Sequence, residues 1–148
     1  MEYQEKKSIA TVIGTILIFG IYYWFVFQRY HSAALSTEEE LQFWSKAILI
    51  GIPVSIGGKI VLFILFAIFN TIITKEKLPK FEDERDKLIE LKATRNAFFI
   101  FGIGFVVAMF VLAFGHAPYY MFLALIIAGV VSEIFDNLSR LYFHRRGV

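Results

Sequence analysis

Two ionisable residues interrupt long apolar stretches of this chain, where they could carry a charge or a proton. Lys59 lies inside an apolar stretch from 47 to 74, and Glu133 lies near the end of another, from 119 to 135. Lys59 follows Trp44 by 15 positions, which is about 22 Å of helix. An unpaired ammonium so deep in apolar surroundings costs several kcal/mol. We therefore expect Lys59 to find a partner, lose its proton or face water.

Glu133 is the expected partner of Lys59. It follows Pro118 by 15 positions, so it lies at the same depth of about 22 Å if both stretches are helices running in one direction. Small residues recur every fourth position on the helix of Glu133, and such spacing allows the close approach that the pair requires. These small residues are Ala124, Ala128 and Ser132.

Other polar residues are expected to support this pair. Ser55 and Asn70 fall on nearly the same helix face as Lys59. Ser132 and Asp136 lie on the side of Glu133, and Asp136 is expected to pair with a basic residue four positions further on, Arg140. Three interpretations stay open: a protonatable pair in a transport pathway, a structural ion pair joining two helices, and a Glu133 that simply reaches water at the membrane interface.

The composition of the chain is that of an integral membrane protein. Hydrophobic residues make up 57% of the 148 residues and aromatic residues 18%, whereas charged residues fall to 19%. In soluble domains, apolar residues make up about 45–50% of the chain and charged residues about 25%. The chain has no cysteine, which excludes disulfides, iron–sulfur clusters and cysteine-based zinc sites. The net charge of +2 gives no indication of a nucleic-acid partner.

Four apolar stretches are long enough to cross a bilayer, which takes about 20 residues as a helix. The sequence predicts an all-α, four-helix transmembrane bundle that forms a single domain over residues 1–148. A capping box at Ser36 and Glu39 places the start of the second helix well before its apolar part. The expected spans are 9–27, 47–74, 97–114 and 119–135.

The distribution of basic residues predicts the orientation of the four spans. Of the 15 Lys and Arg residues, twelve lie in the two terminal segments and in the segment between the second and third spans. Basic residues accumulate on the cytoplasmic side of membrane proteins. Both termini are therefore expected in the cytoplasm.

No Gly or Pro stands between Glu82 and Gly102, so we expect one long third helix, from about Glu82 to Phe114, that extends into the cytoplasm.

One charged motif resembles a known family. The motif reads Asp83-Glu84-Arg85-Asp86 and is followed by Leu88-Ile89-Glu90-Leu91-Lys92-Ala93 and an apolar span. Over residues 83–140 the chain resembles small uncharacterised bacterial membrane proteins, in which such a D-E-R-D motif precedes the last helical hairpin. The resemblance implies a multi-pass protein of the bacterial cytoplasmic membrane, and it implies no activity.

The sequence carries no motif of a known enzyme class: G-x-S-x-G, H-E-x-x-H, the P-loop and the dinucleotide turn are all missing. We expect no catalytic residue, metal site or cofactor. The favoured function is a non-enzymatic regulatory or accessory subunit, whose partners are the lipid bilayer, a second copy, or a membrane or cytoplasmic protein. The expected contact residues are Asp83, Glu84, Arg85 and Asp86. The alternative is a small ion-coupled transporter or channel subunit, dimeric, that uses the Lys59–Glu133 pair.

Overall fold

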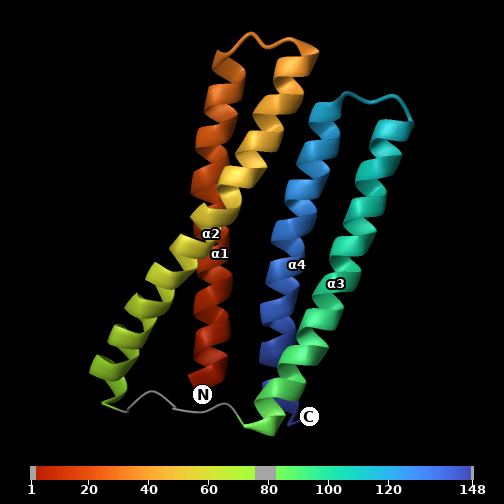
Figure 1. The fold of residues 1–148 in the computed structure, drawn as a ribbon. Helices are drawn as coiled ribbons and strands as arrows, with labels where there is room; N and C mark the ends of the chain where they lie inside the picture. The colour runs from red at the N-terminus through yellow and green to blue at the C-terminus, as the bar shows by residue number, and fades with distance from the viewer. Residues whose placement is uncertain (1–2, 76–82, 148) are drawn as a thin grey trace.

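Four helices form the part of the chain that the computed structural model describes, residues 3–75 and 83–147 (Figure 1). Each helix is long and apolar enough to cross a membrane. The predicted all-α, four-helix class is therefore confirmed, and the chain has the architecture of a multi-pass membrane protein. The helices are α1 (Tyr3–Ser32), α2 (Thr37–Thr74), α3 (Glu84–Ala113) and α4 (Pro118–Arg146).

Local capping interactions fix where α2 and α3 begin. Ser36 caps α2, and the predicted capping box with Glu39 is present, so α2 begins ten residues before its apolar stretch. Asp83 caps α3 by accepting a hydrogen bond from the backbone N–H of Asp86 at 2.8 Å. Gly115, with a φ of +85°, allows the tight turn from α3 into α4.

The third helix is continuous from Glu84 to Ala113, with no break at Arg95. Its expected first residue, Glu82, lies outside the described residues. The helix has 30 residues, and α2 with 38 residues is longer. The capped start of α2, ten residues before its apolar stretch, accounts for this difference in length.

The helices are arranged with α1 and α4 in the middle and α2 and α3 on the outside (Figure 1). α3 packs along α4, α4 packs along α1, and α1 packs along α2. Within the described residues, α2 and α3 make no close contact, and α2 diverges from the bundle towards the end where both termini lie (Figure 1). The bundle is therefore closed at the end of the two tight connections and open towards the termini.

An aromatic cluster holds the closed end together. The Trp44 side chain of α2 is fully buried. Its ring lies 5.4 Å from the ring of Tyr119 and 5.2 Å from that of Tyr30, while Tyr30 and Tyr119 stack at 5.1 Å. These contacts join α1, α2 and α4 at one level along the bundle axis. Residues on α2 and α4 that follow this cluster by the same number of positions therefore lie at the same depth in the bundle.

Two of the small residues of α4, Ala128 and Ser132, face α3, which corrects the expectation that they allow α2 to approach. A Cβ atom added at Gly104 of α3 would lie 2.2 Å from the Cβ of Ala128. Ser132 donates a hydrogen bond to the backbone oxygen of Ala97, also on α3, at 2.8 Å. The short turn at Gly115 keeps α3 beside α4, and Gly104 provides the matching small residue.

Candidate functional site

A polar cavity of about 520 Å³ opens at the end of the bundle where the termini lie. All four helices line it, and Lys59 is the residue that α2 contributes. We call this cavity the vestibule. Its charged lining residues are Lys7, Lys59, Asp86, Glu90, Glu133, Asp136 and Arg140, and the buried His144 also lines it.

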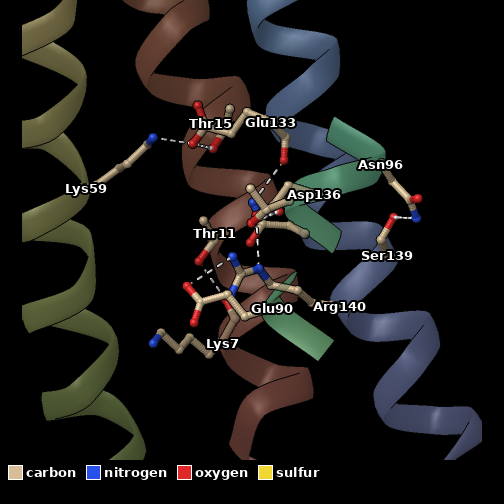
Figure 2. Close-up of polar contacts among 12 residues, drawn as sticks. Lys7, Thr11, Thr15, Lys59, Glu90, Asn96, Glu133, Asp136, Ser139 and Arg140 are labelled. Atoms are coloured by element: carbon tan, nitrogen blue, oxygen red, sulfur yellow. Dashed lines mark hydrogen bonds and ion pairs between the residues drawn. The ribbon is translucent and has the colours of Figure 1, made fainter. Parts of the chain in front are cut away.

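The Lys59 ammonium contacts Oε1 of Glu133, as the equal depths of the two residues predict (Figure 2). The hydroxyl of Thr15 on α1 donates a hydrogen bond to the same oxygen at 3.2 Å. Thr15 is fully buried, whereas 39% of the Lys59 side chain and 19% of the Glu133 side chain are exposed. Three helices thus meet at one carboxylate oxygen at the inner end of the vestibule.

The gap between α2 and α4 explains why a lysine suits this position. Next to Lys59, α2 packs against α1, since a Cβ added at Gly58 would lie 2.8 Å from Ile18, whereas a gap separates the backbones of α2 and α4 (Figure 2). The long side chain of Lys59 crosses this gap and carries its charge to α4 (Figure 2).

A second ion-pair group lies one turn nearer the termini. Arg140 Nε is 2.9 Å from Oδ2 of Asp136, which confirms the predicted pairing of these two residues. Another guanidinium nitrogen of Arg140 is 3.6 Å from Oε1 of Glu90 on α3. The Thr94 hydroxyl donates to the other oxygen of Asp136 at 3.5 Å. Arg140 therefore ties α3 to α4 on the wall of the vestibule (Figure 2).

The expected polar stripe on α2 is not assembled around Lys59. The Ser55 hydroxyl donates to the backbone oxygen of Ile52 on its own helix at 2.8 Å. Neither Ser55 nor Asn70 lines the vestibule. Ser55 lies one turn closer to the tight connections than Lys59, and Asn70 lies eleven residues beyond Lys59, in the half of α2 that diverges from the bundle (Figure 1).

Ser55 instead lines an apolar hollow of about 330 Å³ on the other side of the pair. Phe19 and Ile52 also line this hollow, each several residues closer to the tight connections than the pair. The hollow and the vestibule share two lining residues, Phe101 and Gly129. A polar cavity and an apolar one thus adjoin at the level of Lys59 and Glu133.

The D-E-R-D motif is only partly available as a contact surface. A guanidinium nitrogen of Arg85 donates to the backbone oxygen of His144 at 3.0 Å, and Asp86 Oδ1 lies 3.8 Å from Nδ1 of His144. These two residues therefore fasten the start of α3 to the end of α4. Asp83 and Glu84 are exposed, and Asp83 serves as the N-cap of α3.

The contribution of α1 to the site was not predicted from the sequence. Lys7, Thr11 and Thr15 follow one another at four-residue spacing and so share one face of α1. Lys7 and Thr11 line the vestibule, and Thr15 reaches Glu133. This polar stripe in an otherwise apolar span was the signal that identifies the face of α1 next to the site.

The described residues contain no group of three His, Asp or Glu side chains placed to hold a metal ion. In comparisons with protein families, with curated proteins and with solved structures, nothing matches this chain. The resemblance drawn from the D-E-R-D motif therefore stays a prediction. Any function assigned to the chain rests on the geometry of the vestibule.

Proposed function

We propose that this protein is a small ion-coupled transporter or channel subunit, in which the Lys59–Glu133 pair exchanges a proton with the vestibule. The observation that carries the proposal is a charged cavity that leads from the end of the bundle to an ion pair and adjoins an apolar hollow there. Ionisable residues inside transmembrane segments most often line substrate or proton pathways. An apolar section next to such a pair would hold the pathway closed by excluding water.

The charge of the vestibule favours a proton or a small cation as its ligand. Four carboxylates line the cavity, whereas its permanent cations are three: Lys7, Lys59 and Arg140. With His144 neutral, the lining carries one net negative charge. A proton added to Glu133 would neutralise its carboxylate and weaken the attraction that holds Lys59 across the gap. Proton uptake would therefore loosen α2 from α4, which is the movement that a transport cycle requires.

We propose further that both termini and the vestibule face the cytoplasm of a bacterial cell, with the protein in its cytoplasmic membrane. The excess of basic residues at this end of the chain supports that orientation. In this orientation the first turns of α3 extend beyond the membrane. A second copy of the chain would close the gap between α2 and α3, since four helices barely enclose a pathway.

Proton movement across a membrane tests this function. We expect liposomes that contain the purified protein to dissipate an imposed pH difference at least tenfold faster than protein-free liposomes. The substitution Glu133→Gln should abolish the difference, because an amide does not take up the proton. Glu90→Gln is the matched control: Glu90 also lines the vestibule, yet half of its side chain is exposed. Equal rates for the wild type and Glu133→Gln would contradict the proposal.

The second candidate is the accessory subunit. The observation that favours it is the half of α2 that follows Lys59, where α2 diverges from the bundle (Figure 1) and most of the apolar side chains are exposed. A partner helix could lie along it. The two functions differ over Glu133: an accessory subunit should keep its partner in Glu133→Gln, whereas a proton pathway should fail there.

A further inference from the structure

A groove of about 440 Å³ runs between α1 and α2 at the closed end of the bundle. Apolar side chains form most of its lining, among them Phe25, Phe43 and Ile50. Two cations, Arg29 and Lys46, also line it. It therefore combines positive charge and apolar surface in one cavity, at some distance from the vestibule.

Both cations of this groove are without a carboxylate partner. Within the described residues, neither Arg29 nor Lys46 forms an ion pair, and both side chains are exposed. Two of the three acidic residues in the first turn of α2 are engaged elsewhere: Glu39 completes the cap of α2, and Glu40 accepts a hydrogen bond from Tyr30 at 2.8 Å. The third, Glu38, is exposed and forms no ion pair within the described residues. The charge of Arg29 and Lys46 is thus available to an anion from outside the chain.

The groove is ordered along the bundle axis, with charge at one end and apolar surface at the other. Tyr22 precedes Arg29 by seven residues, so it lies about 10 Å further into the bundle. Ile50 follows Lys46 by four residues on the antiparallel helix, which is about 6 Å in the same direction. The Tyr22 hydroxyl donates to the backbone oxygen of Ala47, so the deep end offers no free polar group.

We propose that this groove binds one phospholipid with a net negative headgroup. The lipid phosphate lies between Arg29 and Lys46, and an acyl chain lies over the apolar lining formed by Phe25 and Ile50. This order of charge and hydrocarbon matches that of a lipid in the leaflet at the closed end of the bundle. A zwitterionic lipid brings its own cation towards Arg29 and Lys46, so an anionic headgroup is preferred. The proposal requires that the helices cross a membrane and is independent of the proton pathway.

Native mass spectrometry of the full chain in a neutral detergent tests this proposal. The probes are phosphatidylglycerol and phosphatidylcholine with the same acyl chains, each added at equal concentration. The wild type should retain one phosphatidylglycerol in preference to phosphatidylcholine. The double variant Arg29→Gln with Lys46→Gln should lose about 30-fold of this preference, which is about fivefold for each cation near the headgroup. If the double variant does not fold, each single substitution should show its fivefold loss.

Two matched controls distinguish lipid binding in the groove from a general effect of positive charge on the protein. Lys87→Gln with Arg95→Gln removes the same charge from exposed positions at the other end of the bundle and should change the preference less than twofold. Ile50→Trp fills the groove with both cations intact and should weaken retention of phosphatidylglycerol. Ile60→Trp, at a similarly exposed position outside the groove, should not.

Three results would overturn the proposal. The first is equal retention of the two lipids by the wild type, and the second is an equal loss in both double variants. The third is complete displacement of phosphatidylglycerol by inorganic phosphate alone, which would assign the site to free phosphate rather than to a lipid.

Discussion

Lys59→Met should lower the free energy of unfolding by about 3 kcal/mol, because it leaves the Glu133 carboxylate without a cation inside the bundle. This is the low end of the range for breaking a buried pair, since 39% of the Lys59 side chain is exposed. The double variant Lys59→Met with Glu133→Gln should recover most of the loss. Chemical unfolding in mixed micelles, followed by circular dichroism, measures all three proteins.

The control for this prediction is the outer ion pair of Arg140. Glu90→Gln removes a half-exposed carboxylate that lies 3.6 Å from the guanidinium, so it should cost no more than about 1 kcal/mol. If the losses of stability in Lys59→Met and Glu133→Gln add up in the double variant, the two residues are not energetically coupled. That result would contradict the ion pair on which the site depends. A stable double variant that moves no protons would support the transport function over a purely structural pair.

Gly104→Ala should lower the free energy of unfolding by about 2 kcal/mol. The added Cβ would lie 2.2 Å from the Cβ of Ala128 and 3.2 Å from its backbone Cα, so α3 and α4 must separate. Overpacking of this kind typically costs about 1–3 kcal/mol. Ala128→Gly in the same chain should restore part of the stability, because it removes the Cβ atom with which the new methyl group clashes. The same unfolding assay in mixed micelles measures both variants.

Gly102 provides the matched control two residues away. A Cβ added at Gly102 meets no atom within 4 Å, so Gly102→Ala should be neutral or stabilise the helix by up to about 1 kcal/mol. Equal effects of the two substitutions would show that α3 and α4 do not approach each other at Gly104.

The depth of the Lys59–Glu133 pair could be predicted from the sequence because both distances start at the same level. Trp44 and Tyr119 contact each other at the closed end of the bundle, with ring centres 5.4 Å apart. From that level α2 and α4 run in the same direction at the same rise per residue. The capping box at Ser36 was equally predictable, because it depends on neighbouring residues alone.

The neighbours of each helix face could not be predicted in the same way. Membrane helices are apolar on every side, so the pattern of Ala128 and Ser132 shows a close contact without identifying the helix that makes it. That helix is α3, through Gly104 and the backbone of Ala97. Arg85 and Asp86 look exposed in a charged segment, yet both turn towards His144 because α3 starts beside the end of α4.

The most direct test of the vestibule is the reactivity of single cysteines, which this cysteine-free chain makes straightforward. A thiol reagent that does not cross membranes is applied to sealed vesicles of either orientation. Thr94→Cys, in the vestibule, should react only from the side on which the termini lie, and Ala117→Cys only from the opposite side. Ser55→Cys, in the apolar hollow beyond the pair, should react from neither side. A reactive Ser55→Cys, or a Thr94→Cys that reacts from the side of Ala117, would contradict a one-sided vestibule that ends at Lys59 and Glu133.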